Sequence, residues 1–421
     1  MRCRTVVLSS LTFPTRIPAD FPLLFSGVFI LLLLSSHALS QPARGANKFL
    51  GNITQRGQVP KNFSTYWNHI MGENECKWGS VEMTRDRMNW RGADSIAAFA
   101  RRNNISWTFY ALFMTGAYPG WQNSITAPEL LEEIEEWMDS AAARYPDAAI
   151  INVINENYNN SIPGCYRQAL GGEGTTGFDW AVKAFRMARE RWPEALLMYN
   201  DYNNLEWESY NRWTIDFVTA LLDADAPIDV VGCEAHDTYT MPTDSVKMYI
   251  DRIAALGLPV IISEYDISEG NDAVQDSIMR EQFTMFWNHP KIVGINYWGY
   301  IVGSTWRDNT GLITPEGAER PALTWLVDYV KNNPDPPNDF PELFNLGSTI
   351  SVLHDNPSGK VYGVTAVGSD RIPVRLFDLC GRQVGSYRIT SGTDGFSAAV
   401  RASGTYVLQW DNFCKSLVKS R

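Results

Sequence analysis

The stretch Ala-Ile-Ile-Asn-Val-Ile-Asn-Glu at residues 149–156 decides the fold. It is a short run rich in β-branched residues, and it ends in the polar pair Asn155 and Glu156. A helical pattern at 128–144 precedes it, with apolar side chains on one face: Leu130, Leu131, Ile134, Trp137 and Met138. A helix followed by a short apolar strand is typical of a parallel sheet with helical crossovers.

The same alternation recurs on both sides of this stretch. Strand-like runs occur at 49–53, 69–72, 106–112, 149–154, 196–199, 229–233, 259–263 and 293–298. These eight repeats predict an α/β fold, a closed (β/α)8 TIM barrel over residues 45–331. An open, doubly wound sheet is the alternative.

Composition excludes several classes of partner. The 421 residues carry a formal charge of −11, and the sequence pI is near 5.1. Such a chain offers no basic surface for nucleic acid or for anionic lipid headgroups. The 15 Trp and 18 Tyr suit both core packing and stacking on sugars, and we expect core packing to account for most of them.

Residues 1–40 are typical of an export signal. Arginines at positions 2 and 4 precede an apolar run at 21–34, and Ala-Leu-Ser at 38–40 suits cleavage before Gln41. The run is shorter than the ~20 residues that span a membrane, so an anchor is the alternative and we expect no membrane span in the mature chain. The predicted location is secreted or at the cell surface.

A proline-rich linker is predicted at 332–344, since four prolines there cannot continue a helix. Beyond it, the runs at 360–367, 373–378, 396–400 and 404–410 are β-rich and separated by turn residues. They predict a small all-β C-terminal domain, a β-sandwich, at 345–421.

The mature chain keeps five cysteines, an odd number, so a disulfide framework is not expected. Cys76 and Cys233 are predicted to be small buried residues. Cys380 and Cys414 are a candidate pair.

Polar side chains follow the predicted strands where each one ends. In a TIM barrel these carboxyl ends form the active face. The residues in question are Glu73, Asn74, Asn155, Glu156, Asn200, Asp201, Glu234, His236, Glu264, Asp266 and Trp298.

Glu156 and Glu264 follow strands four and seven and are expected to face each other across the barrel mouth. Cleaving an acetal bond with retention needs one carboxylic acid and one carboxylate nucleophile, about 5 to 5.5 Å apart. The negative charge of Glu264 would raise the pKa of Glu156, which makes Glu156 the acid/base. His236 and Asp266 are placed to support Glu264 as the nucleophile.

Eight motifs occur in order along the barrel: Gly-Glu-Asn-Glu-Cys-Lys-Trp (72–78), Asn-Val-Ile-Asn-Glu (152–156), Tyr-Asn-Asp-Tyr-Asn (199–203), Gly-Cys-Glu-Ala-His (232–236), Ser-Glu-Tyr-Asp-Ile (263–267), Tyr-Trp-Gly (297–299), Thr-Trp-Arg (305–307) and Arg-Pro-Ala (320–322). With them, the chain from about residue 49 to 330 resembles glycoside hydrolase family 10, the endo-β-1,4-xylanases. Together the motifs are highly specific, although each alone is weak.

The resemblance implies roles for further residues. Asn74 and Lys77 would bind sugar hydroxyls on the non-reducing side, and Asn155 would hold the 2-hydroxyl beside the nucleophile. Trp298 and Trp306 would line the walls of the substrate cleft. Tyr110 and Asn200 complete the expected substrate-binding set, and no metal or cofactor is expected.

Strand three departs from the family pattern Gly-His-Thr-Leu-Val-Trp-His-Ser-Gln. Residues 109–117 read Phe-Tyr-Ala-Leu-Phe-Met-Thr-Gly-Ala, so Tyr110, Met114 and Ala117 replace His, Trp and Gln. Glu234 stands where the family has Gln, which adds a carboxyl that can shift neighbouring pKa values. The substrate could therefore be a decorated chain or a sugar with a 6-hydroxymethyl group.

The tail resembles the C-terminal sorting domains of type IX secretion, through Arg-Leu-Phe-Asp-Leu-Cys-Gly-Arg-Gln-Val (375–384) and Ser-Gly-Thr-Tyr-Val-Leu (403–408). That resemblance implies the outer-membrane secretion machinery as a partner. A carbohydrate-binding module is the alternative.

The favoured hypothesis is a retaining endo-hydrolase of a β-1,4-linked plant polysaccharide, xylan first. A metal-dependent barrel hydrolase is a second hypothesis, because Glu234, His236, Glu264 and Asp266 supply ligand types. A non-catalytic sugar-binding protein is a third, motivated by the altered strand three.

Overall fold

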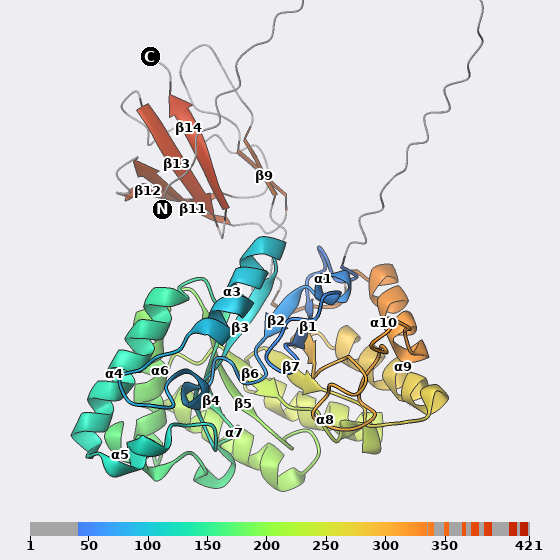
Figure 1. The fold of residues 1–421 in the computed structure, drawn as a ribbon, viewed down its shortest axis with the longest axis horizontal. Coiled ribbons are helices and arrows are strands. Elements are labelled where there is room, and N and C mark those ends of the chain that lie inside the picture. The colour runs from blue at the N-terminus through green and yellow to red at the C-terminus, as the bar shows by residue number, and fades with distance from the viewer. Residues whose placement is uncertain are drawn as a thin grey trace, which may run out of the picture. The chain divides into compact units, whose positions relative to one another are not determined.

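Eight parallel strands close into a barrel in the computed structural model of the chain (Figure 1). The structure describes residues 41–334 and 336–340 in full, and the backbone of six later strands. The barrel strands are β1 (Phe49–Ile53), β2 (His69–Met71), β3 (Ser106–Met114), β4 (Ile150–Asn155), β5 (Leu196–Asp201), β6 (Val230–Cys233), β7 (Val260–Tyr265) and β8 (Ile292–Tyr297).

Each strand pairs in parallel with the next, and β1 also pairs with β8, with Phe49 opposite Gly294. This last pairing closes the barrel, so the TIM-barrel prediction is confirmed and the open doubly wound sheet is wrong.

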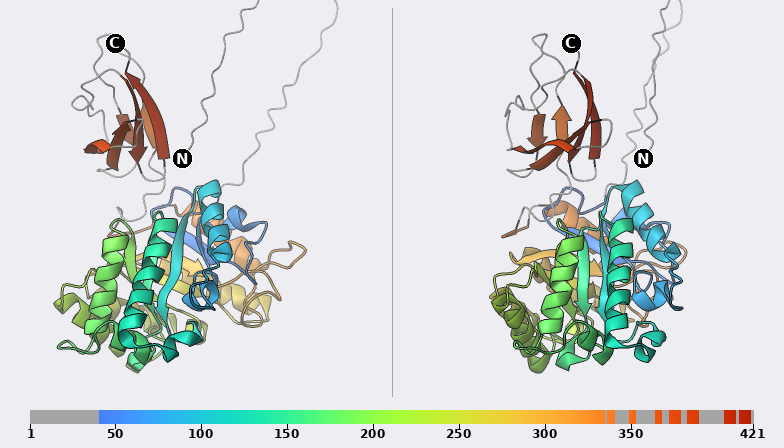
Figure 2. Two further views of the ribbon diagram at one scale, coloured as in Figure 1. Left: turned by 60° about the vertical axis from the view of Figure 1, so that its left-hand side comes forward. Right: turned by 90° about the vertical axis from the view of Figure 1, so that its left-hand side faces the viewer.

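Helices connect the strands and lie around the outside of the barrel (Figure 2). They are α1 (Phe63–Tyr66), α2 (Trp78–Val81), α3 (Arg91–Asn103), α4 (Ala127–Arg144), α5 (Gly164–Ala169), α6 (Asp179–Arg191), α7 (Glu208–Asp223), α8 (Thr243–Ala254), α9 (Asp272–Asn288) and α10 (Pro321–Asn332), with 3-10 turns η1 (Gly120–Ser124), η2 (Tyr158–Asn160) and η3 (Thr238–Thr240).

Helix α4 shows why the sequence starts a helix where it does. Thr126 and Glu129 form a capping box, in which each side chain accepts a hydrogen bond from the other residue's backbone N–H. The helix buries Leu130, Ile134 and Trp137 against the barrel, as its apolar pattern predicted. The cap and the apolar face therefore fix where the helix starts and which side meets the sheet.

Four strands continue one or more residues past their predicted ends. β3 reaches Met114, β4 reaches Asn155, β5 reaches Asp201 and β7 reaches Tyr265. Backbone pairing does not depend on side-chain polarity, so in β4, β5 and β7 the ladder passes through polar residues at which an apolar pattern stops. In β3 the added residues, Phe113 and Met114, are apolar. Asn155, Asn200 and Glu264 are consequently held by the sheet itself rather than by loops.

Side chains fill the barrel from end to end. Near the amino ends of the strands, Phe49 packs in a cluster with Ile150, Met198, Val230, Ile261 and Val293. Higher up, the buried His69 bonds to Ser106 and Thr108. At the carboxyl ends, Tyr110 and Trp298 close the core in a further cluster.

Most of the tryptophans serve packing, as expected. The fully buried ones are Trp67, Trp78, Trp107, Trp137, Trp180, Trp192 and Trp287. Among the described residues, Trp207 and Trp306 are the exposed ones. Cys76 and Cys233 are buried, as predicted. Cys380 lies outside the described residues, and only the backbone is described at Cys414.

The described part of the predicted linker packs against the barrel. The amide of Asn338 donates to the carbonyl of Asn47, and Lys291 forms an ion pair with Asp339 at 3.0 Å. Phe340 lies against the apolar cluster at the amino ends of the strands. Residues 336–340 thus extend the barrel's contacts beyond α10.

Beyond this point the structure describes strand backbone only. Strands β9 (Thr349–Val352) and β10 (Val364–Val367) form an antiparallel pair. Strands β11 (Ile372–Asp378), β12 (Gln383–Ile389), β13 (Gly404–Trp410) and β14 (Phe413–Lys419) form a sheet of order β12-β11-β13-β14. The β-sandwich and the domain boundaries stay predictions.

The predicted export signal at 1–40 lies outside the described residues. Among the helices that are described, none has both the length and the apolar character needed to cross a membrane.

Candidate active site

A pocket of about 350 Å³ opens at the carboxyl ends of the strands. Its lining includes eight of the residues predicted from the sequence: Lys77, Tyr110, Glu156, Glu234, His236, Glu264, Trp298 and Trp306. It also includes four residues that were not predicted: Tyr202, Asn203, Asp237 and Arg307. The structure therefore brings together residues in or after seven strands, β2 to β8, including the loop after β8.

Glu156 has an unusual backbone. Its φ is +57°, in the left-handed region that side chains other than glycine rarely adopt. Three hydrogen bonds hold it there: its N–H donates to the Asn200 carbonyl at 2.9 Å, and its own carbonyl accepts from Thr115 Oγ1 and Ser161 Oγ. This conformation turns the carboxyl group into the pocket.

The Glu156 carboxyl group is set up to hold a proton. Burial and the negative charge of Glu264 raise its pKa to about 7. Lys77, His236 and a hydrogen bond from Asn155 Nδ2 to Oε1, at 3.0 Å, act in the opposite direction. Near neutral pH and below, Glu156 can donate a proton.

Glu264 is surrounded by hydrogen-bond donors. Its Oε1 accepts from Tyr110 Oη at 2.9 Å and from Asn200 Nδ2 at 3.2 Å, while Oε2 lies 3.3 Å from His236 Nε2. The residue is 3% exposed. Hydrogen bonds to a charged form favour that form, so these donors stabilise Glu264 as a carboxylate.

His236 bridges two carboxylates. Its Nδ1 lies 3.1 Å from Asp266 Oδ2, on the opposite side of the ring from Glu264. Burial opposes protonation, but Asp266 and Glu264 outweigh it and raise the pKa of His236 to about 10. At neutral pH, His236 is a cation that donates through both nitrogens.

The loop after β8 holds the other side of His236. Trp306 lies with its ring 4.6 Å from the imidazole and donates from Nε1 to Asp266 Oδ2 at 2.7 Å. Arg307 pairs with Asp237 at 2.6 Å and donates to the His236 carbonyl. The Thr-Trp-Arg motif thus fixes the histidine that faces Glu264.

Lys77 supplies a further cation to the pocket. Its Nζ donates to Asn74 Oδ1 at 2.9 Å and lies 5.1 Å from the centre of the Tyr110 ring. Asn74 itself is exposed and is not part of the pocket lining. Tyr110 in turn accepts from Asn155 Nδ2 at 3.1 Å, which connects the two glutamates through one phenol.

Asn155 and Asn200 lie beneath the pocket with no exposed surface. Asn200 Nδ2 reaches Asn155 Oδ1 at 2.8 Å, and Asn152 Nδ2 reaches the same oxygen at 2.7 Å. Ser263 Oγ donates to Asn200 Oδ1 at 2.5 Å. These contacts make Asn200 a support for the carboxyl groups. Asn152 and Ser263 were not singled out from the sequence, although both lie inside quoted motifs.

Gly232 allows this arrangement. A Cβ at this position would lie 2.2 Å from Asn200 Oδ1. The strand β6 residue beside Asn200 must therefore be glycine for the asparagine to keep its place.

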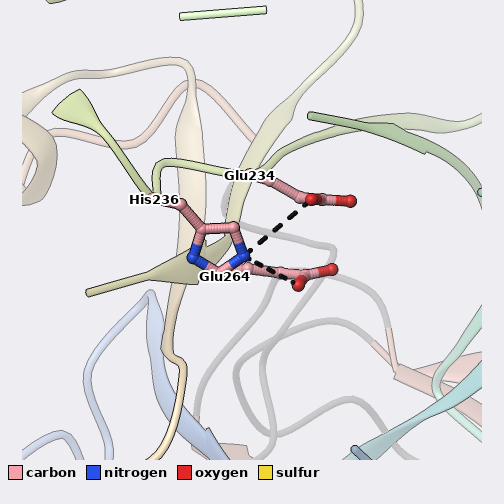
Figure 3. Close-up of side chains that lie close together, drawn as sticks. All are labelled: Glu234, His236 and Glu264. Atoms are coloured by element: carbon pink, nitrogen blue, oxygen red, sulfur yellow. Dashed lines mark hydrogen bonds and ion pairs between the residues drawn. The ribbon is translucent and has the colours of Figure 1, made fainter. Parts of the chain in front are cut away.

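Glu234, His236 and Glu264 lie close enough to share one ion, with their ligand atoms within 4.8 Å of one another (Figure 3). A histidine with a pKa of about 10 is protonated at neutral pH and has no free nitrogen lone pair for a metal. Asp266, the fourth residue of the metal hypothesis, is bonded instead to His236 and Trp306. The donor set is better suited to hydrogen bonding than to metal binding.

Comparison with known proteins places this geometry in a family. The family model described as "Glycosyl hydrolase family 10" matches residues 39–329. The chain belongs to glycosyl hydrolase family 10.

Two curated relatives are named as xylanases. Endo-1,4-beta-xylanase B of Cellvibrio japonicus is 42% identical over 288 residues, which cover 68% of this chain and 46% of that protein. The chain thus spans less than half the length of this relative. Endo-1,4-beta-xylanase B of Thermotoga neapolitana is 27% identical over 251 residues, covering 57% of this chain and 72% of that protein.

Solved structures share the barrel fold. The crystal structure of native xylanase 10B from Thermotoga maritima superposes with a TM-score of 0.61 at 23% identity, covering 70% of this chain and 98% of that chain. At this identity the likeness speaks for the fold alone.

The altered strand three affects this family 10 site unevenly. Tyr110 lines the pocket and bonds to Glu264. Met114 is buried, and neither Met114 nor Ala117 belongs to the pocket lining. Of the three substitutions, the one at Tyr110 changes the chemistry next to the carboxyl pair.

Proposed function

We propose that the protein is a retaining endo-1,4-β-xylanase, with Glu156 as acid/base and Glu264 as nucleophile. One observation carries the proposal: two glutamates line one pocket, one placed to hold a proton and the other placed to remain a carboxylate. Family membership and the names of the two xylanase relatives support the substrate.

In the first step, a carboxylate oxygen of Glu264 attacks the anomeric carbon and Glu156 gives its proton to the glycosidic oxygen. The carbon–oxygen bond to the leaving sugar breaks, and a glycosyl ester forms on Glu264. In the second step, Glu156, now ionised, takes a proton from water, whose oxygen attacks the same carbon and releases Glu264. Both residues return to their starting states.

The cations and donors around Glu264 support these steps. Protonated His236 and the Tyr110 hydroxyl hold the carboxylate in one orientation. Lys77 lies in the pocket wall, where it can donate hydrogen bonds to sugar hydroxyls. The rings of Trp298 and Trp306 can stack on the apolar face of a sugar. Asn155, bonded to Glu156, is positioned between the two catalytic carboxyls.

A different or decorated β-glycan is the second candidate substrate. The observation that favours it is Tyr110, which occupies the wall beside Glu264 where the family pattern has His. A phenol at this point presents a larger, less polar surface to the sugar that lies over the nucleophile.

Hydrolysis of defined polysaccharides tests the proposal. The protein is incubated with xylan, arabinoxylan, mixed-linkage glucan and mannan, and new reducing ends and product lengths are measured. We expect release of xylo-oligosaccharides of several lengths from xylan. Preference for glucan or mannan would favour the second candidate. No turnover of any, with binding unchanged by Glu264→Ala, would favour a non-catalytic sugar-binding protein.

We also propose that the chain is exported, with residues 1–40 as the signal and residues 345–421 as a sorting domain recognised by outer-membrane secretion machinery. The sequence patterns described above support this. In the native host, the mature protein should begin at Gln41 and appear outside the cell, and deletion of 345–421 should retain it inside. Export that persists after the deletion would instead fit a sugar-binding role for this segment.

A further inference from the structure

Glu234 lies beside Glu264, and the two carboxyl groups receive very different numbers of hydrogen bonds. Glu264 accepts from Tyr110, Asn200 and His236. Glu234 Oε1 accepts from Asn200 Nδ2 at 3.0 Å, and its Oε2 is 3.9 Å from His236 Nε2, beyond hydrogen-bond distance. The donors therefore favour a negative charge on Glu264 over one on Glu234.

The two carboxyl groups are also close to each other. The same Asn200 nitrogen lies 3.0 Å from Glu234 Oε1 and 3.2 Å from Glu264 Oε1. In Figure 3 both carboxyl groups approach the same imidazole nitrogen. Glu234 is 4% exposed and Glu264 3%. Two buried carboxyls this close share a proton rather than both ionise.

The charges around the pair lead to the same conclusion. The titratable groups that face Glu234 come from β3 to β7 and the loops after them: Tyr110, Glu156, Tyr199, Asp201, Cys233, His236 and Glu264. Lys77, after β2, and Asp266 lie further out. The cations His236 and Lys77 balance two carboxylates, Glu264 and Asp266. A third buried carboxylate would have to share His236 with Glu264 and Asp266 and would lack a counter-charge of its own, which is costly.

We propose that Glu234 is a neutral carboxylic acid in the working protein and donates a hydrogen bond to the Glu264 carboxylate. It is then a positioning residue for the nucleophile. The proton stays on Glu234 throughout: the hydrogen bond weakens when Glu264 becomes an ester and is restored when water releases it. The inference rests on the proposed function only for the role of Glu264.

Chemistry and electrostatics both support this assignment. A neutral carboxyl has one O–H donor and one carbonyl acceptor, which matches the donor and acceptor of the glutamine in the family pattern. Burial, and then the negative charges of Glu264 and Glu156, raise the pKa of Glu234 well above its ordinary value. Glu234 can thus accept from Asn200 and donate to Glu264 at the same time.

Carbon NMR of the full chain, labelled at glutamate side-chain carboxyls, tests the protonation state directly. The resonance that disappears in Glu234→Gln is followed from about pH 5 to about pH 8. We expect it to keep the chemical shift of a protonated carboxyl throughout this range. The buried Glu206, assigned with Glu206→Gln, is the internal control, because its pKa of about 7 should make its resonance titrate.

Two variants test the donor role. Glu234→Leu removes the hydrogen bond and should lower kcat/KM on xylan by about tenfold to a hundredfold, the worth of a hydrogen bond to a charged group. Glu234→Gln restores a donor to Glu264 and an acceptor for Asn200, so it should recover most of that loss.

Two results would overturn the proposal: a Glu234 resonance that titrates anywhere between about pH 5 and about pH 8, or a Glu234→Gln variant as impaired as Glu234→Leu. The first would mean an ionised carboxylate, and the second a requirement for its charge. If the protein did not cleave xylan, the proposed function would fail, whereas the NMR titration would still decide the state of Glu234.

Discussion

Glu156 and Glu264 carry the same side chain in opposite surroundings. The Glu264 carboxylate accepts hydrogen bonds from a phenol, an amide and an imidazolium. Glu156 accepts one hydrogen bond, from an amide, and the charge of Glu264 raises its pKa. Their identity and strand positions could be read from the sequence. Their hydrogen-bond partners could not, because these come from residues far apart in the chain.

Replacing the acid should separate two classes of substrate. We expect Glu156→Ala to lower kcat/KM on xylan by about 10²- to 10⁴-fold, the usual contribution of a general acid. For an aryl glycoside, the leaving phenolate needs no proton from Glu156. The rate of the first step, formation of the glycosyl ester, should therefore fall much less with this substrate. Exposed Glu135→Ala is the control. An equal loss on both substrates would contradict the assignment.

The pH dependence follows from the state of Glu156. The acid must be protonated, and its pKa is raised to about 7, so kcat/KM should be constant at mildly acidic pH and fall as pH rises through about 7. A pH profile of initial rates on xylan measures this. A fall that begins near an ordinary glutamate value, between pH 4 and 5, would show that burial and Glu264 do not control Glu156.

At the scale of the elements, the strand-to-helix alternation predicted the barrel, and the strand-end rule predicted most of the pocket wall. The sequence did not predict the supporting roles of Asn152 and Ser263, because both residues lie inside strands. There, sequence position alone does not distinguish a buried polar residue that has a hydrogen-bond partner from one that has none. The sequence also did not predict the ion pair of Arg307 with Asp237, because it joins two loops that are 70 residues apart.

Strand β6 gives an element-scale prediction. Gly232→Ala should push Asn200 away from Glu264 and Glu234, because the added Cβ would lie 2.2 Å from its side-chain oxygen. We expect kcat/KM to fall by about a hundredfold, as for other misplacements near 1 Å. Gly120→Ala, which has no atom within 4 Å of its added Cβ, is the control. Circular dichroism checks that both variants fold, and unchanged activity of a folded Gly232→Ala would contradict the prediction.

For the whole molecule, the cluster of buried carboxyls makes stability depend on pH. Burial raises the pKa of Asp201 to about 8, and that of Glu206 to about 7. In the unfolded chain the pKa values of these two groups are near 4. Between those values and the raised ones, the folded chain binds more protons than the unfolded chain, so stability falls as pH rises. His69, whose pKa burial lowers to about 3, acts in the opposite sense below about pH 6.5, but it is one group against the two carboxyls. Lys48, with its pKa lowered to about 7, acts in the opposite sense only above that pH.

The melting temperature should therefore be higher at about pH 5 than at about pH 7, by ~2 °C or more. Differential scanning calorimetry measures the change. Asp201→Asn removes one of the titrating groups and should flatten the pH dependence. A melting temperature that rises over this interval would mean that Asp201 and Glu206 ionise normally in the folded chain.

Trapping of the glycosyl intermediate tests the central claim most directly. The protein is incubated with a 2-deoxy-2-fluoro-xylobioside that carries a good leaving group, and its peptides are examined by mass spectrometry. The account predicts one added disaccharide, in the peptide that contains Glu264 and on that residue. An active protein that forms no adduct, or forms it on Glu156 or elsewhere, would contradict the proposed nucleophile and the retaining mechanism.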